Sequence, residues 1–346
     1  MIDRPMTLNT GIFGAGAIGS YVGGYLVAGG HRITLLGRAR QVSDFANHGL
    51  TLTHFEKSDI TVPPGGAMFT EDASQLNGCD IIFVTVKSQD TAQAAAQLKP
   101  LVSPGTLILS LQNGVGNTDI LAANLPNAQV IKAMIPNNVL AMGTGRYHMG
   151  TEGAIAMTLN AQTKPIIKAM AAAGLDIEGR TDMAALQWSK LIMNLSNACN
   201  TLAGQTIYEH LRGRDHRRVL AMAVDETLAV LRAADITPPK VGKVNPKTIP
   251  TLLRLPDFIY HRLMPLILKI DEKARSSMAQ DLMNAKPRSE IEALNGAVVE
   301  LGKEVGVPTP VNSYITEQIK AAFDAGESPQ LSGAEMLAGI KAYAPE

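Results

Sequence analysis

The sequence predicts an α/β fold, with a doubly wound parallel sheet domain followed by an all-α helical domain. In the first half, short β-rich apolar runs alternate with helical segments, which is typical of a parallel sheet covered by helices. From about residue 182 the periodicity becomes helical almost throughout. The 346 residues exceed what one hydrophobic core usually serves. We therefore expect two domains, with bounds at 1–181 and 182–346.

In the first half, short apolar runs bounded by turn residues predict strands. The runs "TGIF", "RITLLG", "CDIIFVTVK", "TLILSLQNG" and "QVIKAMI" fit strands, and "AIGSYVGGYLVAGG" fits a helix after the first. The third and fourth runs are continuously apolar, as buried central strands are. The glycine-rich stretch "GTGRYHMGTEGAIAM" predicts a hairpin or a pair of edge strands.

The second half predicts five long helices. Apolar residues recur at helical spacing over residues 182–204, 217–236, 255–283, 289–306 and 312–326. A connector rich in proline and lysine, "ITPPKVGKVNPKTIP", interrupts them. We interpret the basic cluster in this half as a solvated face. It consists of Arg212, Arg214, Arg217 and Arg218.

Composition excludes several classes of protein. The formal net charge is zero, which favours neither nucleic acid nor a membrane surface as a partner. The first ten residues carry no secretion signal, and no apolar run approaches the ~18 residues of a membrane span. Cys79 and Cys199 are too few for a disulfide scaffold, so a cytoplasmic location is expected. The seven histidines show no metal-binding spacing.

The segment "GAGAIG", residues 14–19, has the G-x-G-x-x-G spacing of a Rossmann dinucleotide-binding turn. An apolar strand precedes it and a helical segment follows it, as that motif requires. Gly14 permits the tight turn, Gly16 lets a pyrophosphate approach the backbone, and Gly19 lets helix and strand pack closely. The helix N-terminus offers free N–H groups to the phosphates. We expect the whole segment, with Ala15, Ala17 and Ile18, to bind the cofactor; the alternative is a turn without a ligand.

The end of the second predicted strand favours NADP(H) over NAD(H). An acidic residue there would bind the ribose 2′-hydroxyl of NAD, but this chain has Gly37 at that place. Arg38 and Arg40 follow it, and a guanidinium suits the extra 2′-phosphate of NADP. Arg38 is the better candidate because it lies nearer the strand end. Both could instead be ordinary solvated loop charges.

Five motifs, in order, resemble those of the ketopantoate reductases, also called 2-dehydropantoate 2-reductases. They are the glycine turn, "VTVKSQD", "SLQNG", "WSKLIMNLSNACNTLAG" and "ARSSMAQDLMNAKPRSEIEALNG", with "GVPTP" after them. The resemblance runs from Gly11 to about Asn312. It implies an enzyme that uses NADPH to reduce a 2-keto acid to a 2-hydroxy acid in pantothenate synthesis, with its active site between the two domains. It also leaves a homodimer open as the assembly.

The resemblance assigns roles to particular residues. Lys190 matches the catalytic lysine and Glu290 the acidic residue that contacts the substrate. Asn194 and Ser277 match substrate-binding positions. Lys87 and Asn113 match polar residues near the nicotinamide, where Asn113 would also meet the substrate.

The chemistry and the spacing agree with these roles. Hydride addition to a ketone places negative charge on oxygen, and an ammonium group supplies both a proton and positive charge. Burial or a second lysine such as Lys87 would lower the pKa of Lys190, and Glu290 would oppose that shift. Lys190, Asn194 and Asn197 stand at i, i+4 and i+7, so they share one helix face, where Asn197 would join the substrate site.

Structural roles for these residues remain open at this point. Lys190 could be a surface lysine, and Ser277 a small helix residue. Glu290 could be an acid in a first helical turn, since Ser289 and Glu292 resemble a capping box.

Two departures from the family pattern leave the keto acid undefined. Ala198 and Ala274 stand where the family commonly has asparagine. A paralogue acting on another 2-keto acid and an opine-type dehydrogenase therefore remain alternatives. A non-catalytic NADP(H)-binding protein is a third, although it would not need Lys190.

Overall fold

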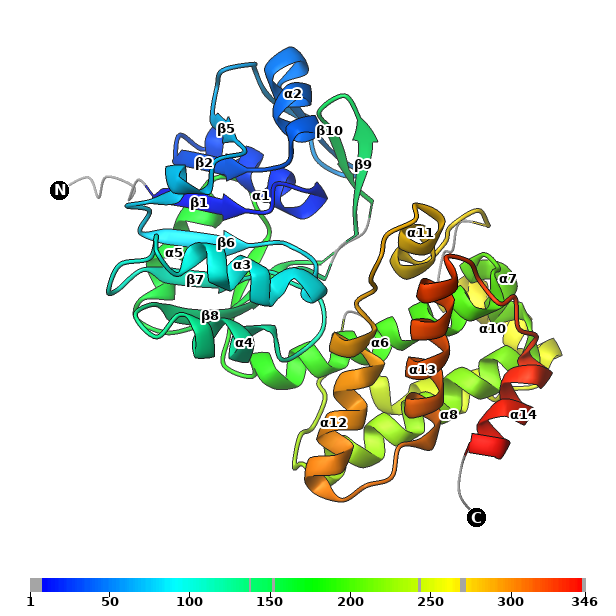
Figure 1. Cartoon of the computed structure of the whole chain (residues 1–346). Coiled ribbons are helices and arrows are strands. Elements are labelled where there is room, and N and C mark those ends of the chain that lie inside the picture. The colour runs from blue at the N-terminus through cyan, green and yellow to red at the C-terminus, as the bar shows by residue number, and fades with distance from the viewer. Residues whose placement is uncertain (1–7, 137, 151–152, 242–243, 268–271, 344–346) are drawn as a thin grey trace. The chain divides into compact units, whose positions relative to one another are not determined.

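The fold is that of a sheet unit followed by a helical unit, as the sequence predicts. The computed structural model describes residues 8–136, 138–150, 153–241, 244–267 and 272–343. It divides the chain into two compact units, Met1–Ala184 and Ala185–Glu346, here unit 1 and unit 2. Among the described residues, all the named strands lie in unit 1, and unit 2 is mainly helical (Figure 1). The division falls within three residues of the expected domain boundary.

In the described part of unit 1, eight strands form one sheet, in the order β12-β11-β8-β7-β6-β1-β2-β5. The pairs from β5 to β8 are parallel, whereas β11 runs antiparallel to β8. The direction of strand order reverses between β1 and β6, which is where open α/β sheets bind ligands. The strands are β1 (Asn9–Phe13), β2 (Arg32–Leu36), β5 (Met68–Thr70), β6 (Ile81–Val84), β7 (Leu107–Ser110), β8 (Gln129–Met134), β11 (Ile155–Thr158) and β12 (Ile177–Arg180).

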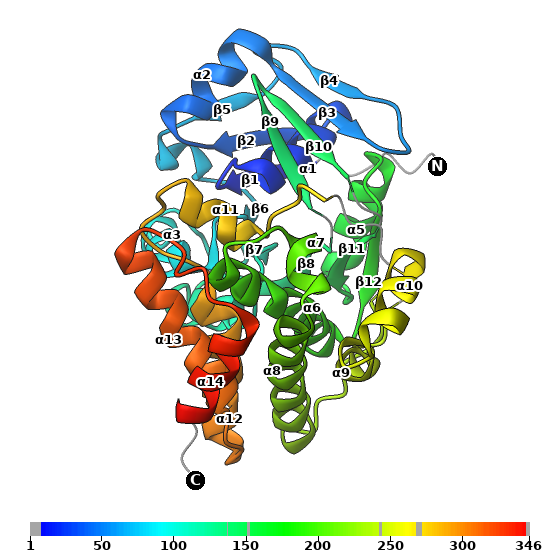
Figure 2. The ribbon, with the colours of Figure 1, turned by 90° about the vertical axis from the view of Figure 1, so that its right-hand side faces the viewer.

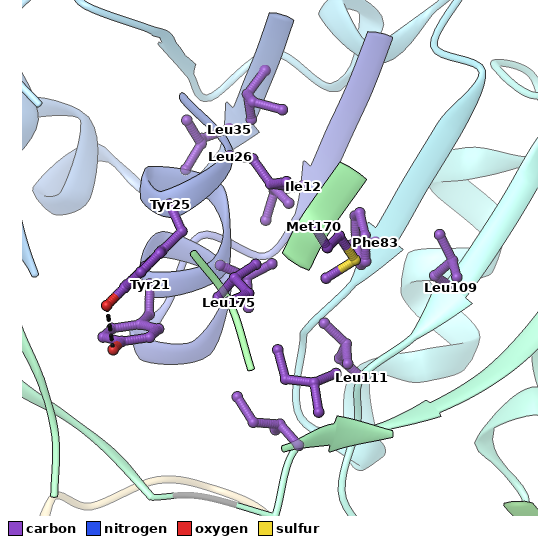
Figure 3. Packing of buried hydrophobic residues seen from close by; sticks show 14 of the residues in the cluster. Ile12, Tyr21, Tyr25, Leu26, Leu35, Phe83, Leu109, Leu111, Met170 and Leu175 are labelled. Atoms are coloured by element: carbon purple, nitrogen blue, oxygen red, sulfur yellow. Dashed lines mark hydrogen bonds between the residues drawn. The ribbon is translucent and has the colours of Figure 1, made fainter. Parts of the chain in front are cut away.

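Helices cover both faces of this sheet because its central strands are apolar on both faces. Ile12 packs with helices α1 (Ala17–Ala28) and α5 (Thr163–Ala172) on one face. The next residue, Phe13, packs with α3 (Thr91–Leu98) and α4 (Asn117–Asn124) on the other. Figure 3 shows the first of these cores, where the hydroxyl of Tyr21 donates to that of Tyr25 at 3.2 Å. The continuously apolar runs are therefore buried central strands, as expected.

A second sheet, which the sequence did not predict, packs against α1. Its order is β4-β3-β10-β9, and β3 pairs with β10 in parallel (Figure 2). The strands are β3 (Leu50–His54), β4 (Ile60–Val62), β9 (Val139–Gly143) and β10 (Arg146–Met149). The predicted hairpin over residues 143–157 is therefore only partly right. β9 and β10 form a hairpin through Thr144 and Gly145, both with positive φ. Residues 151–152 lie outside the described ones, and Ile155 begins β11 of the larger sheet.

Helix α6 (Met183–Ala203) leads from unit 1 into unit 2 and agrees with the predicted helix 182–204. Helix α8 contacts α9, α12, α13 and α14, so it is central to the unit. The other described helices are α7 (Ile207–Arg212), α8 (Arg214–Ala233), α9 (Ile249–Leu253), α10 (Asp257–Ile267), α11 (Ser277–Met283), α12 (Asn295–Val305), α13 (Pro310–Ala325) and α14 (Gly333–Tyr343). Between them lie the short 3₁₀ turns η3 (Pro246–Thr248) and η4 (Ile291–Ala293).

Two of the five predicted helices are broken in the structure. The expected helix 255–283 is α10 and α11, with residues 268–271 outside the described ones. The expected helix 289–306 is η4 followed by α12, because Leu294 leaves the helical region with φ −113° and ψ −102°. Asn295 then donates from its side chain to Asn312 of α13 at 3.0 Å. This buried contact fixes where α12 begins.

Arg217 corrects the interpretation of the basic cluster as a solvated face. Its side chain is fully buried, whereas Arg218 is exposed. The Arg217 guanidinium donates to four backbone carbonyls and to the carboxylate of Asp257 at 2.6 Å. It also lies 3.9 Å from the ring centroid of Tyr260. A guanidinium has five N–H donors, so this site satisfies a charge that burial would otherwise make costly.

His210 on α7 is a buried polar side chain with unsatisfied nitrogens. Neither ring nitrogen has a hydrogen-bond partner among the described residues. Its ring centroid lies 4.9 Å from that of His216 on α8. Burial, with a smaller contribution from His216, lowers the pKa of His210 to about 3. The ring is therefore neutral at physiological pH.

The described helices include none that is both long and apolar enough to cross a bilayer. Within the same residues, no three His, Cys, Asp or Glu side chains gather as metal ligands would. Cys79 and Cys199 are both buried free thiols.

Candidate active site

The turn between β1 and α1 has the geometry that its three glycines predict. Gly14 has φ +106°, in the left-handed region that favours glycine. A Cβ on Gly19 would lie 2.5 Å from the Gly14 carbonyl oxygen and 2.6 Å from Thr85 Oγ1. A Cβ on Gly16 would meet nothing closer than the Gly14 carbonyl oxygen at 4.0 Å. Gly14 and Gly19 are thus required by the backbone and the packing, whereas Gly16 faces open space.

This open space fits a dinucleotide phosphate. Helix α1 begins at Ala17, and no side chain caps it at Gly16. The first N–H groups of a helix have no intrahelical acceptor and carry partial positive charge, which suits a phosphate. The glycine turn is itself held in place, since Gly14 N and Ala15 N both donate to the carbonyl of Leu36 on β2, at 3.1 and 2.7 Å.

The loop after β6 is fastened to the glycine turn and carries Lys87. Thr85 donates its hydroxyl to the carbonyl of Gly14 at 2.6 Å. A Cβ on Gly14 would also lie 2.7 Å from Val86 Cγ1. Asn113 follows β7 on the neighbouring loop, and both Lys87 and Asn113 are half-buried. Unit 1 therefore brings Lys87, Asn113 and the glycine turn to the same edge of the sheet.

The end of β2 places Arg38 and Arg40 on the surface of unit 1. Gly37 is the residue after β2, and Arg38 precedes helix α2 (Ala39–His48). The Arg38 backbone N–H donates to Gln41 Oε1 at 3.2 Å. Both arginine side chains are exposed, so their guanidinium groups can meet a phosphate from solvent.

In unit 2, helix α6 presents Lys190, Asn194 and Asn197 together. All three are half-buried, while the neighbouring Leu191 and Leu195 have no exposed surface. This contrast confirms the spacing argument, because the three polar residues lie on one face and the leucines on the face toward the core.

Lys190 and Glu290 form an electrostatic pair. Burial lowers the pKa of Lys190 to about 8, and the carboxylate of Glu290 acts in the opposite direction. Glu290 is buried and precedes η4, so its place at a helix start also agrees with the structural alternative. A lysine with a pKa near neutral can both hold and release a proton at physiological pH.

Ser277 is exposed at the start of α11, and its neighbour Ser276 fastens that helix to α6. Ser276 Oγ donates to the carbonyl of Asn197 at 3.2 Å, and Ser276 N donates to Asn200 Oδ1 at 3.2 Å. These bonds place the first turn of α11 beside the turn of α6 that carries Asn197. Ser277 is thereby available to a ligand at that face.

The two alanine positions lie in different surroundings. Ala198 is fully buried in the helical core, and Ala274 is half-buried, with its carbonyl accepting from Ile207 N at 2.9 Å.

Sequence reasoning missed the polar residues that support this site. Thr85, Ser88, Thr91, Gln112 and Asn117 make side-chain hydrogen bonds between the loops after β1, β6 and β7. The available signal was their position, since each lies just after a strand or at the start of the next helix. The motif "SLQNG" pointed to Asn113, but its buried polar side chain is that of Gln112.

Comparison with known proteins decides the family. The model described as ketopantoate reductase PanE/ApbA matches residues 10–162, and its C-terminal companion matches residues 182–323. The chain belongs to the ketopantoate reductase family. The first match lies within unit 1 and the second covers most of unit 2, so the family's two regions are both present.

Ketopantoate reductases are also found among curated proteins and solved structures similar to this chain. A 2-dehydropantoate 2-reductase from Aquifex aeolicus is 27% identical over 324 residues, covering 90% of this chain and 95% of that protein. A ketopantoate reductase structure from Ralstonia eutropha has a TM-score of 0.78 at 29% identity, with 92% and 99% of the two chains covered. D-mandelate dehydrogenase with NADH and anilino(oxo)acetate shares the fold, with a TM-score of 0.73 at 22% identity and the same coverage.

Because the chain belongs to this family, it is an oxidoreductase that depends on a nicotinamide dinucleotide. The glycine turn described above is the part of the chain that fits such a cofactor.

Proposed function

We propose that the protein is a 2-dehydropantoate 2-reductase, which uses NADPH to reduce the 2-keto acid 2-dehydropantoate to the 2-hydroxy acid pantoate. The observation that carries this proposal is Lys190, half-buried beside Glu290 with its pKa lowered to about 8. A group of this kind suits reversible proton transfer to a carbonyl oxygen. The reaction itself is inferred from the chain's membership of the ketopantoate reductase family.

Unit 1 would hold the cofactor. Bound NADPH supplies the hydride. Ala17 to Gly19, at the start of α1, would hold its pyrophosphate through backbone N–H groups, with Gly14 to Gly16 shaping the turn beside it, and Arg38 would pair with the 2′-phosphate. Lys87 and Asn113 would line the nicotinamide end, because they follow the strands on the far side of the sheet's reversal point.

Unit 2 would hold the substrate and supply the proton. The Lys190 ammonium gives its proton to the keto oxygen as negative charge develops there. Glu290 keeps part of the lysine protonated by opposing the effect of burial. Asn194, Asn197 and Ser277 are neutral hydrogen-bonding groups that suit the carboxylate and hydroxyl groups of a small hydroxy-keto acid.

A second candidate is the reduction of another 2-keto acid. It is favoured by Ala198 and Ala274, and by the D-mandelate dehydrogenase fold relative, which was solved with anilino(oxo)acetate. Opine formation would need an amine as well as the keto acid. A non-catalytic NADP(H)-binding protein is disfavoured, because it would not need a lysine whose pKa is lowered at this position.

The test is NADPH oxidation by the purified protein against a panel of 2-keto acids with and without amines. The proposal expects 2-dehydropantoate to give the highest kcat/KM without an amine. A larger value for an aryl keto acid would favour the second candidate, and turnover only with an amine would favour the opine reaction. Light scattering on the same sample would show whether the mass is twice the 36.8 kDa of one chain, as a homodimer requires.

A further inference from the structure

The loops after β6 and β7 are joined by a buried network of side-chain hydrogen bonds. Four residues form it, and we call them the loop clasp: Ser88, Thr91, Gln112 and Asn117. All four are buried. Ser88 and Thr91 lie after β6, where the 3₁₀ turn η2 (Ser88–Asp90) leads into α3. Gln112 and Asn117 lie after β7, where Asn117 is the first residue of α4.

The bonds of the clasp run in a chain from Gln112 through Thr91 and Asn117 to Ser88. Gln112 Nε2 donates to Thr91 Oγ1 at 2.7 Å, and Thr91 Oγ1 lies 2.9 Å from Asn117 Oδ1. Asn117 Nδ2 then donates to Ser88 Oγ at 3.1 Å. Both Ser88 Oγ and Asn117 Nδ2 donate to the carbonyl of Asn113, each at 2.7 Å.

This arrangement fixes the backbone on both sides of Lys87. Gln112 Nε2 donates to the carbonyl of Val86 at 3.1 Å. The Thr91 hydroxyl has one proton, which it shares between Asn117 Oδ1 and the carbonyl of Ser88, 2.8 Å away. The carbonyl groups of Val86 and Ser88, the residues on either side of Lys87, therefore both have side-chain contacts. The carbonyl of Asn113 is held twice, as described above. The clasp thus acts on the two residues of unit 1 that we assign to the nicotinamide end of the cofactor.

A buried polar network needs a reason, because apolar side chains of similar size would pack there without polar groups to satisfy. Polar side chains are directional, so they fix a loop conformation that apolar contacts would leave adjustable. The clasp lies at the carboxyl edge of the sheet, where ligand-binding loops gather. It does not extend to the amino end of β7, where Thr106 makes only a local contact with Ser103 N at 3.2 Å.

We propose that the loop clasp is a set of positioning residues, which hold Lys87 and Asn113 in the conformation that binds the nicotinamide end of the cofactor. The inference rests on the proposed function, since it requires a nicotinamide dinucleotide at this edge. It adds that recognition of the nicotinamide end depends on Thr91, Gln112 and Asn117, none of which needs to touch the ligand.

The test separates the two ends of the cofactor. Affinities are measured for NADPH and for adenosine 2′,5′-bisphosphate, which carries the adenine and the 2′-phosphate but no nicotinamide. Thr91→Val removes the central hydroxyl at nearly constant volume. Thr106→Val is the matched control, since Thr106 is also buried and belongs to the opposite end of β7. Thr91→Ser restores the hydroxyl. Ser88→Ala is a milder second variant, in which Asn117 still holds the carbonyl of Asn113.

We expect Thr91→Val to weaken NADPH at least fivefold and to leave the bisphosphate within twofold. We expect kcat/KM to fall on the order of tenfold or more, because small misplacements are costly in catalysis. Thr91→Ser should recover most of both losses, Thr106→Val should change neither, and Ser88→Ala should shift NADPH in the same direction by less.

Three outcomes with the variants would overturn the inference. They are unchanged NADPH affinity in both Thr91→Val and Ser88→Ala, equal losses for the two ligands, or a loss of the same size in Thr106→Val. If Thr91→Val does not fold, Ser88→Ala decides alone. If the unaltered protein binds the bisphosphate and NADPH equally, the nicotinamide end is not recognised and the inference fails. If it binds neither, the proposed function fails.

Discussion

The hydroxyl of Thr85 donates to the carbonyl of Gly14 at 2.6 Å, and so joins the loop after β6 to the glycine turn after β1. Gly19 is packed against both of these groups, whereas Gly16 is not. The two glycines therefore differ in what an added methyl group would do.

Gly19→Ala should destabilise unit 1, while Gly16→Ala should spare its stability and weaken the cofactor. The Gly19 Cβ would lie 2.5 Å from the Gly14 carbonyl oxygen, and overpacking of this kind typically costs ~1–3 kcal/mol. The Gly16 Cβ would occupy the space assigned to the pyrophosphate, and φ −78° at Gly16 is open to alanine. Thermal denaturation and NADPH titration of both variants test this. Unchanged NADPH affinity in Gly16→Ala would contradict the assigned phosphate position.

Arg38→Ala should remove most of the preference for NADPH over NADH. The unaltered protein should favour NADPH at least tenfold, or ~1.4 kcal/mol, through the 2′-phosphate. Arg40→Ala should have a smaller effect, because Arg40 lies further from the end of β2. Dissociation constants for both cofactors measure this. Equal affinities in the unaltered protein would rule out the assignment.

Lys190→Ala should lower kcat on the order of 10³-fold and leave NADPH affinity within twofold. General acid catalysis contributes typically 10²–10⁴-fold, and the lost positive charge adds to it. Lys341→Ala, an exposed lysine on α14, is the control and should be silent. If Lys190→Ala keeps its activity within fivefold of the parent, Lys190 is not the proton donor. Lys87 is then the next residue to test.

The pH dependence should follow the ammonium form of Lys190. With a pKa of about 8, keto-acid reduction falls above pH 8, by about tenfold per unit, because the protonated amine is the active form. Oxidation of the hydroxy acid needs the neutral amine and so rises through the same range. Glu290→Gln removes a group that raises the pKa of Lys190, so the fall in reduction should move to lower pH. If the pH profile of Glu290→Gln matches that of the unaltered protein, Glu290 does not influence the pKa of Lys190.

His210 should make the protein less stable in acid. Its pKa is about 3 in the folded state and near 6.5 when exposed, so the unfolded chain binds a proton that the folded chain does not. The free energy of unfolding should therefore decrease as pH falls from 6.5 toward 3, by about 1.4 kcal/mol per pH unit from this group. His210→Leu should reduce that slope, while His48→Leu on α2 should keep it. Denaturant titrations across this range measure both.

Local patterns predicted the central sheet well. The runs that became β1, β2, β6, β7 and β8 are short and apolar, so each carries its own signal. The second sheet carries little local signal, because β3 and β10 pair across about ninety residues, as Thr51 with Arg146. Such contacts arise from the tertiary fold. The break at Leu294 has the same origin, since the contact of Asn295 with Asn312 fixes the start of α12.

The glycine turn carries its own signal in the spacing of its three glycines. Lys190 was assigned through the resemblance to the family, and the spacing only placed it on one helix face with Asn194 and Asn197. The loop clasp could not, because Thr91 and Asn117 are ordinary residues until their loops come together. The roles given to individual site residues remain predictions, which the variants above address.

The loop clasp also constrains recombination between this chain and its relatives. A chimera with its crossover between α3 and β7 would take Thr91 from one parent and both Gln112 and Asn117 from the other. Such a crossover is tolerated only where the two parents supply matching donors and acceptors. Residues 86–117 should therefore be exchanged as one block, whereas the surface link between β3 and β4 is a more permissive place to join parents.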